Sequence, residues 1–211
     1  MKILIDNGHG RETLGKRSPD GSLREYKWAR EIASRLEQAL KQKGLDAERI
    51  VKEENDVSLG ERSRRVNSIC QRLGTANVIL VSIHCNAAPP NDNKWHNARG
   101  WSVWTSVGKT KADALATAIW DAMNSRLSAY KATFSGVGNQ KPMRADYSDG
   151  DPDFESNFWI LRKTSCPAVL TENLFQDNEQ DVAYLLSEQG KQTIVEAHVE
   201  GIVKYINTNK K

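Results

Sequence analysis

The chain has 211 residues, of which 38% are hydrophobic and 27% are charged, and its mean hydropathy is −0.63. These values exclude membrane-embedded, collagen-like and fully disordered classes of protein. The 30 Lys and Arg residues exceed the 27 Asp and Glu residues by three, and a net charge of +3 is too small to indicate a nucleic-acid partner. We therefore expect a single domain over residues 1–211, with one core and a small or locally polar substrate.

Hydrophobic patterning predicts six strands and five helices. In chain order these are a strand over 2–5, a helix over 23–43, a strand over 46–51, a helix over 60–74, strands over 77–83 and 100–105, a helix over 109–128, strands over 158–161 and 168–171, and helices over 178–187 and 190–206. The run 77–83 is almost continuously apolar, so it is expected to be a central strand buried on both faces. Because strands and helices alternate, we predict an α/β domain with a mostly parallel, roughly six-stranded central sheet flanked by helices.

The helix ends carry their own signals. Apolar residues recur at spacings of three, four and seven through 23–43, and Gly44 ends that helix. Ser58 is expected to cap the helix over 60–74, with Glu61 three residues later completing a capping box. The arginines of that helix predict a basic face.

Two polar segments are predicted to be loops. Residues 86–99 contain Pro89-Pro90 and several Asn, and residues 133–157 are rich in Gly, Asp, Asn and Ser. The acidic sequence DYSDGDPDFES in the second segment lacks the ordered spacing of an EF-hand. We interpret that segment as a substrate-side loop beside an open groove rather than as a calcium site.

Three predicted strand ends present polar sequences that are suited to chemistry. They are Asp6-Asn7-Gly8-His9-Gly10, Ser82-Ile83-His84-Cys85-Asn86 and Leu170-Thr171-Glu172-Asn173. Functional groups gather at the carboxyl ends of strands in an open α/β sheet, so His9, His84 and Glu172 are expected to converge. With Glu25 from the start of the first helix, two His and one Glu suit a catalytic Zn²⁺ that keeps a fourth position open for water. Glu172 would then be free to act as a base.

Each of these residues also has an ordinary structural interpretation. His9 would be a loop histidine that caps a helix, His84 a hydrogen-bonded histidine at a strand edge, and Glu25 a solvated carboxylate favoured by the helix dipole. The spacings of 16 and 59 residues between them match no compact metal motif such as HExxH. Cys85 is expected to point to the opposite face of the strand from His84 and to be a structural thiol.

Six sequence strings occur in the order and approximate spacing of a known family. They are DNGHG, SLREYKWAREIASRLEQAL, SLGERSRRVN, VSIHCNAA, GWSVW and ILRKTSCPAVLTENLFQDN. From Lys2 to about Ile206 the chain resembles the zinc-dependent N-acetylmuramoyl-L-alanine amidases that cut bacterial cell wall. The resemblance implies a peptidoglycan hydrolase that cleaves the amide bond between the lactyl group of N-acetylmuramic acid and L-Ala of the stem peptide.

The resemblance also implies roles for individual residues. His9, Glu25 and His84 would bind one Zn²⁺ per chain, and Glu172 would be catalytic. Arg162 matches an Arg often found near the active site in this family, and with Asn86 it is a candidate to bind the substrate, because a guanidinium can hold a carboxylate bidentately. The alternative for Arg162 is a surface residue at a strand end.

Two other functions compete with this one. A zinc peptidase or deacetylase would share the metal site but cut another amide, and a non-catalytic wall-binding module would need no base beside a metal. For the amidase, the expected partner is peptidoglycan, with no nucleic acid and no transmembrane segment, and the chain is expected to be a monomer with no separate wall-binding domain.

The place of action also has alternatives at this stage. The chain opens with the strand-like MKILID, which shows no export signal, and its three cysteines lack the spacing of a disulfide framework. Synthesis in a reducing cytoplasm fits these features best. We therefore expect a protein that acts on the cell wall after endolysin-like release, or after secretion or export to the periplasm if a signal was removed.

Overall fold

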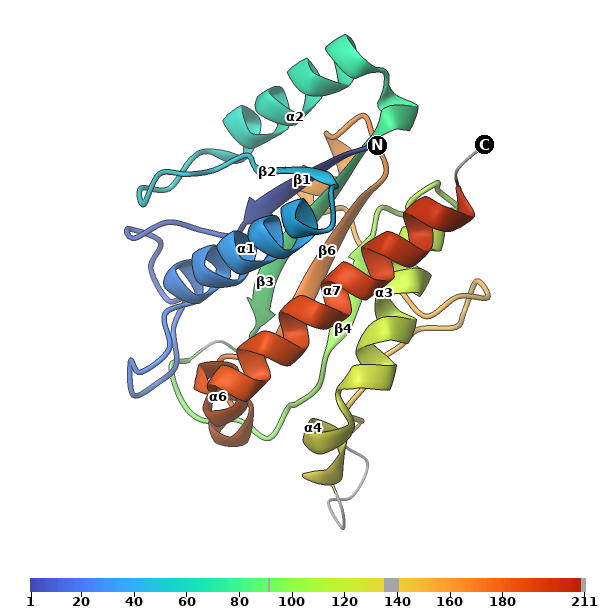
Figure 1. Cartoon of the computed structure of the whole chain (residues 1–211). Coiled ribbons are helices and arrows are strands. Elements are labelled where there is room, and N and C mark those ends of the chain that lie inside the picture. The colour runs from blue at the N-terminus through green and yellow to red at the C-terminus, as the bar shows by residue number, and fades with distance from the viewer. Residues whose placement is uncertain (91, 135–140, 210–211) are drawn as a thin grey trace.

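A six-stranded sheet organises the computed structural model, which describes residues 1–90, 92–134 and 141–209 (Figure 1). The strands are β1 (Lys2–Asn7), β2 (Asp46–Arg49), β3 (Val78–Asn86), β4 (Ser102–Thr105), β5 (Phe154–Glu155) and β6 (Ala168–Phe175). Their order across the sheet is β2-β1-β3-β6-β4-β5. The first four of these are parallel, β4 is antiparallel to β6, and β5 is parallel to β4. The predicted α/β fold with a mostly parallel sheet is confirmed.

Helices cover both faces of this sheet. They are α1 (Glu25–Gln42), α2 (Leu59–Leu73), α3 (Asp113–Arg126), α4 (Ser128–Ala132), α5 (Trp159–Arg162), α6 (Glu179–Leu186) and α7 (Glu188–Thr208), with a 3₁₀ turn η1 (Thr75–Asn77) before β3. Figure 1 shows α1, α7 and α3 in front of the strands, where they enclose the larger apolar cluster. The other face packs a smaller apolar cluster against α2 and α5.

The central strand β3 divides the two clusters. Its side chains alternate between them, so that Val81 lies in the larger cluster and Leu80 in the smaller one, both fully buried. Burial on both faces explains why the run is continuously apolar. The strand continues to Asn86, three residues beyond the predicted end, and His84 therefore lies within the strand rather than after it.

The predicted capping box of α2 forms only in part. Ser58 caps the helix, since its side chain accepts a hydrogen bond from the Glu61 backbone N at 3.3 Å. The Glu61 carboxylate instead pairs with Arg64 at 2.6 Å and Arg65 at 2.9 Å. Two guanidinium groups one turn away are stronger partners for a carboxylate than the single backbone N–H of the cap.

The strand predicted over 158–161 is wrong, because Trp159–Arg162 forms the short helix α5. Ile160 and Leu161 are both buried in the smaller cluster, and a strand would have turned these neighbours to opposite faces. The sixth strand is instead β5, inside the segment 133–157 that was predicted to be a loop. The remainder of that segment has little regular structure from residue 141 to residue 153, and residues 135–140 lie outside the described residues.

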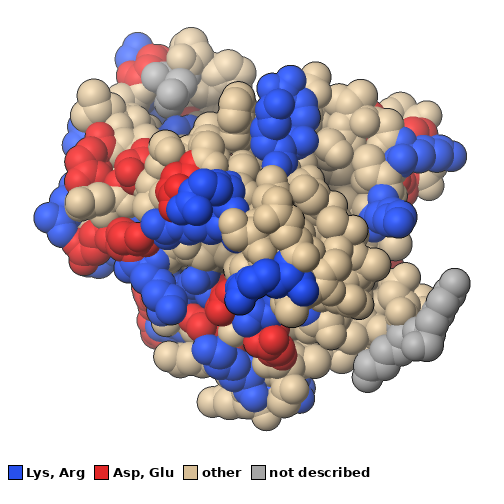
Figure 2. All heavy atoms as spheres, turned by 90° about the horizontal axis from the view of Figure 1, so that it is seen from above, with Lys and Arg blue, Asp and Glu red and all other residues tan. Residues whose placement is uncertain are grey.

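Charges of both signs share the surface. In the view of Figure 2, Lys and Arg side chains lie among Asp and Glu side chains, in keeping with the net charge of +3. Across the described residues, we find no helix with the length and apolar character that a membrane span requires.

Candidate metal centre

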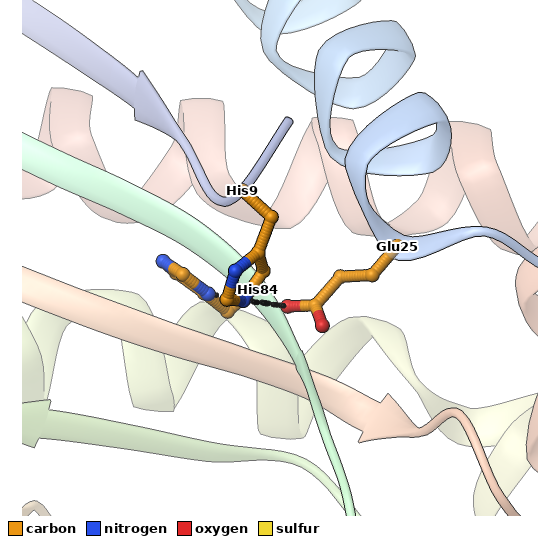
Figure 3. Close-up of side chains that lie close together, drawn as sticks. All are labelled: His9, Glu25 and His84. Carbon is orange, nitrogen blue, oxygen red and sulfur yellow. Dashed lines mark hydrogen bonds and ion pairs between the residues drawn. The ribbon is translucent and has the colours of Figure 1, made fainter. Parts of the chain in front are cut away.

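Three side chains from three elements meet at the carboxyl ends of β1 and β3 (Figure 3). His9 lies in the loop after β1, Glu25 is the first residue of α1, and His84 lies in β3. Glu25 Oε1 is 3.3 Å from His9 Nε2 and 3.1 Å from His84 Nδ1. All three potential ligand atoms lie within 4.8 Å of one another. Residues that are 16 and 59 positions apart in the sequence thus form one group.

The loop that carries His9 is shaped by close contact with His84. Gly8 N donates a hydrogen bond to Ile83 O at 3.0 Å, and a Cβ atom at Gly8 would lie 2.3 Å from His84 Cε1. Only glycine lets the backbone rest against the imidazole in this way. His9 follows with a φ of 61°, a backbone conformation that is uncommon for residues other than glycine and is enriched at functional sites. The two imidazole rings meet edge to face, with centroids 4.9 Å apart.

Arg62 of α2 fixes the backbone of the same loop. Its side chain is 2% exposed and donates hydrogen bonds to Asn7 O at 2.6 Å, His9 O at 3.1 Å and Asp6 Oδ1 at 2.6 Å. Ser82 Oγ donates to the other Asp6 oxygen at 2.6 Å. Breaking a buried ion pair by removing one partner costs about 3–5 kcal/mol, so this pair holds the loop firmly.

Glu25 is the buried anchor of the group. Its side chain is fully buried, whereas those of His9 and His84 are 20% and 16% exposed. Its Oε1 also accepts a hydrogen bond from Cys85 N at 3.0 Å, while its Oε2 is buried without a partner among the described atoms. Burial opposes ionisation, but the hydrogen bonds and charges of the two histidines hold the pKa of Glu25 below its usual value. Burial likewise acts to lower the pKa of His84, and Glu25 raises it overall.

Glu172 faces the same group from the neighbouring strand β6. It pairs in register with His84, so both side chains project from one face of the sheet. Its Oε2 is buried and has no partner among the described atoms. Burial raises the pKa of Glu172 to about 7, with Glu25 acting in the same direction and His84 against it. A carboxyl group with a pKa near neutrality can both accept and release a proton.

The two neighbours of Glu172 in the sequence hold β6 in place. Asn173 Nδ2 donates a hydrogen bond to His84 O at 3.0 Å. Thr171 Oγ1 lies 3.1 Å from Nε2 of His198 on α7. Burial lowers the pKa of His198 to about 4, so this histidine is neutral near pH 7. Sequence reasoning assigned no role to Asn173 and Thr171, and their places on either side of a strand-end Glu were the only signal.

Cys85 does not belong to the chemistry of the site. Its side chain is 3% exposed and lies in the larger apolar cluster, on the opposite face from His84. Burial, together with Glu25 and Glu172, raises the pKa of the thiol well above its usual value. A protonated, buried thiol is neither a nucleophile nor a ready metal ligand.

Asn86 and Arg162 occupy opposite ends of the sheet, and the Asn86 Oδ1 accepts a hydrogen bond from Ala87 N at 2.9 Å. Asn86 ends β3, two residues after His84, and its side chain is half-buried. Arg162 is exposed at the end of α5, with its guanidinium carbon 5.9 Å from the centroid of the Trp159 ring. Leu161, next to it, lines a cavity together with residues 166–168, which lead into β6. Arg162 therefore lies toward the amino end of β6, whereas the His-Glu-His group lies at the carboxyl ends of the strands.

Two of the three separations between the ligand atoms match those of a zinc site. A tetrahedral Zn²⁺ holds N and O ligands at about 2.0–2.1 Å, which places ligand atoms about 3.3 Å from one another. The two distances from Glu25 Oε1, 3.3 Å to His9 and 3.1 Å to His84, have this spacing. Imidazole with carboxylate is also a donor set that suits zinc. The partial exposure of both rings leaves a side of the group open to water and substrate.

Fold and site together define a class of hydrolase in which a His-Glu-His group that could hold a metal and an adjacent Glu lie at the strand ends of an α/β sheet. A family model described as N-acetylmuramoyl-L-alanine amidase matches residues 3–204, and the chain belongs to this family. The protein is thus an amidase that hydrolyses peptidoglycan, as the resemblance of its sequence strings predicts.

Individual relatives agree with this assignment. The endolysin of Bacillus phage SPP1 is 28% identical over an alignment of 215 residues, gaps included. The alignment covers 99% of this chain and 67% of the relative. The amidase CwlM of Bacillus licheniformis is 27% identical over 217 residues, which cover 100% of this chain and 70% of the relative. Among solved structures, the N-acetylmuramoyl-L-alanine amidase from Clostridium difficile 630 has a TM-score of 0.78 at 23% identity, with 99% of this chain and 98% of that chain covered. At this sequence identity, the similarity to the Clostridium difficile structure is evidence for the fold of this chain alone.

Proposed function

We propose that this amidase uses one Zn²⁺ to cleave the bond between the lactyl group of N-acetylmuramic acid and L-Ala of the stem peptide. The meeting of His9, Glu25 and His84 beside Glu172 is the observation that supports it most directly. A wall-binding module would need no buried carboxyl group of raised pKa next to a metal-binding group. Membership of the amidase family favours the muramoyl amide over the amides that a peptidase or deacetylase cuts.

In the proposed mechanism Glu172 moves the proton. A bound Zn²⁺ supplies a Lewis acid for the amide carbonyl and lowers the pKa of water. Glu172 accepts a proton from the attacking water and donates it to the leaving amine of L-Ala, which needs no covalent intermediate. General acid–base help of this kind contributes about 10²- to 10⁴-fold to the rate. Glu25 would hold the same ion as the two imidazoles from its buried position.

We also propose that Asn86 and Arg162 contact the substrate. Asn86 stands two residues beyond His84, where the reacting amide must lie. Along β6, Ala168 lies four residues before Glu172, which corresponds to a rise of about 13 Å. An extended stem peptide of four residues has about the same length. Because both faces of β6 are buried, a stem peptide would have to extend about this far over the outside of α5 to bring its carboxylates to Arg162.

The test of the function is the chemistry of the digestion products. Purified peptidoglycan treated with the enzyme should gain free L-Ala amino termini, because the muramoyl amide is the bond that opens. A chelator should abolish this activity and added Zn²⁺ should restore it. New termini at another amide would identify a peptidase, and release of acetate would identify a deacetylase. Binding to peptidoglycan without any new amino termini would identify the protein as a non-catalytic binding module.

The contact with Arg162 has a separate test. Arg162→Ala should raise the KM for muropeptides with free stem carboxylates by about 10-fold and change kcat little, because it removes a charge-assisted hydrogen bond that is present in ground and transition states alike. The matched control is Lys163→Ala, which removes the neighbouring exposed cation. An unchanged KM in the Arg162 variant would make this residue a surface arginine only. Amidated muropeptides should show no difference between the two variants.

The amidase acts on the cell wall, and its SPP1 relative is named an endolysin. We propose that residues 1–211 form one catalytic domain that works as a monomer. It would reach the wall by endolysin-like release, or by secretion or export to the periplasm. The single sheet, to which strands from Lys2 to Phe175 contribute, supports the one-domain organisation.

A further inference from the structure

Two carboxyl groups, one buried and one half-buried, lie together in the turn before β5. Asp153 is 3% exposed, and its Oδ2 accepts a hydrogen bond from Thr105 Oγ1 at 2.5 Å. The Asp151 carboxyl lies within hydrogen-bonding distance of the Asp153 carboxyl. Their Oδ1 atoms are both buried, and neither has a donor among the described residues. Each of the two neighbouring aspartates thus has a buried carboxylate oxygen that can only accept hydrogen bonds and receives none.

The charge around this pair is negative. Asp113, at the start of α3, adds a third carboxylate, whose own oxygens accept hydrogen bonds from N and Oγ1 of Thr110 at 2.8 and 2.6 Å. The ion pairs of the described residues include none that joins Asp113, Asp151 or Asp153 to a Lys, Arg or His. Burial and the neighbouring Asp151 raise the pKa of Asp153 to about 8. An arrangement of this kind requires either a proton or a cation.

We propose that a divalent cation of the Ca²⁺ type binds between Asp151 and Asp153. Ca²⁺ prefers carboxylate, carbonyl and water oxygens, and the two unpartnered Oδ1 atoms provide the first two ligands. A divalent cation neutralises the negative charges of both carboxylates. A shared proton neutralises only one of them, and the other carboxylate then remains charged beside Asp113. This differs from the expectation from sequence, which excluded calcium here because the segment lacks EF-hand spacing. The proposed site does not need that spacing, because its two aspartates come from one turn that a hydrogen bond from Thr105 holds at the end of β4.

This site is separate from the His-Glu-His group. Thr105 ends β4, three residues beyond Ser102, which pairs with Glu172. Three strand residues span about 10 Å. They lead toward the amino end of β6, whereas the zinc ligands lie at the carboxyl ends of the parallel strands. The ligands also differ in kind, since oxygen atoms alone favour Ca²⁺ and imidazoles favour zinc. The two sites can therefore be tested independently.

A cation here would stiffen one wall of the face that carries Glu172. Asp153 directly precedes Phe154, whose ring stacks on Trp104 with centroids 4.9 Å apart and planes inclined by 28°. Trp104 Nε1 in turn donates a hydrogen bond to Ser102 Oγ at 3.2 Å. Binding of the cation should therefore stabilise the fold.

The experiment compares the zinc-loaded full chain before and after addition of CaCl2. Equilibrium dialysis with calcium should find about one Ca²⁺ per chain, and Tm should rise by about 3 °C or more at about 5 mM CaCl2. The double variant His9→Ala/His84→Ala should bind the same amount of Ca²⁺, because it keeps both aspartates. Loss of calcium binding in that variant would place the cation in the zinc site and overturn the proposal.

Variants of the turn complete the test. Asp151→Asn and Asp153→Asn should lose both the bound Ca²⁺ and the rise in Tm, while Asp149→Asn from the same turn should keep both. Asp151 is the less buried of the pair, so its variant remains informative if Asp153→Asn fails to fold. Absence of calcium binding and of any Tm shift in the unmodified chain would show that the carboxyl pair holds a proton instead. Retention of binding by Asp151→Asn would contradict the proposed ligands.

Discussion

Replacing His84 with alanine should remove most of the bound Zn²⁺ and abolish peptidoglycan cleavage. The unmodified chain should contain about one Zn²⁺, because two imidazoles and one carboxylate complete the protein part of a catalytic zinc site. The variant keeps His9 and Glu25, and two ligands hold zinc far more weakly than three. Elemental analysis of the dialysed protein measures the loss, and His9→Ala should give the same result for the same reason.

His96→Ala is the matched control for these two variants. His96 lies in the loop after β3, where its Nε2 is 2.9 Å from Asp92 Oδ1, and it belongs to no part of the metal group. This variant should keep its zinc and its activity. Measurement of Tm for all three variants separates loss of metal from loss of fold. Full retention of zinc by both His9→Ala and His84→Ala would remove the proposed site.

The convergence of His9 and His84 could be predicted because it depends on sheet topology alone. Each follows or ends an apolar run, and adjacent parallel strands bring their carboxyl ends to the same edge. Glu25 was harder to place, because its position depends on where α1 begins after a loop of irregular structure. Ligand chemistry suggested this carboxylate as the third member of the set, and the match to family strings supported that choice.

The support of the His9 loop could not be predicted in the same way. The arginines of α2 predict a basic solvent face, yet Arg62 is buried against Asp6 while Arg64 is exposed. Arg62 does precede Val66 and Ile69 by four and seven residues, which places it on the apolar stripe of the helix. That spacing indicates that Arg62 is buried. It does not identify the residue that pairs with the buried charge, which here is Asp6 on another element.

The strand predicted over 158–161 was wrong for a related reason. An aromatic and β-branched run favours a strand locally, whereas the packing of α2 offers one apolar surface on which both Ile160 and Leu161 are buried.

The pairing of Asp151 with Asp153 is likewise a tertiary effect. In a strand these two side chains would lie on the same face but about 7 Å apart, and the turn brings their carboxyl groups within hydrogen-bonding distance.

Replacing Glu172 with glutamine should reduce turnover by on the order of 10²-fold or more, because the side chain keeps its shape but loses its proton acceptor. Zinc content and Tm should change little, since Glu172 is proposed as a base and not as a ligand. Burial raises the pKa of Glu172 to about 7, and a cation beside the carboxylate would lower it. The base must be ionised to accept a proton, so kcat/KM of the unmodified enzyme should fall as the pH decreases through a value at or below about 7.

The variant Glu172→Gln should lose this acid limb of the pH profile, because its amide does not titrate in that range. Asn173→Ala is a useful comparison, since it removes the hydrogen bond to His84 O but keeps the carboxyl group and should keep the acid limb. A near-normal rate in Glu172→Gln would show that another group accepts the proton. Loss of zinc together with activity would instead make Glu172 a fourth ligand, and the carboxyl group facing His84 would then hold the metal rather than move the proton.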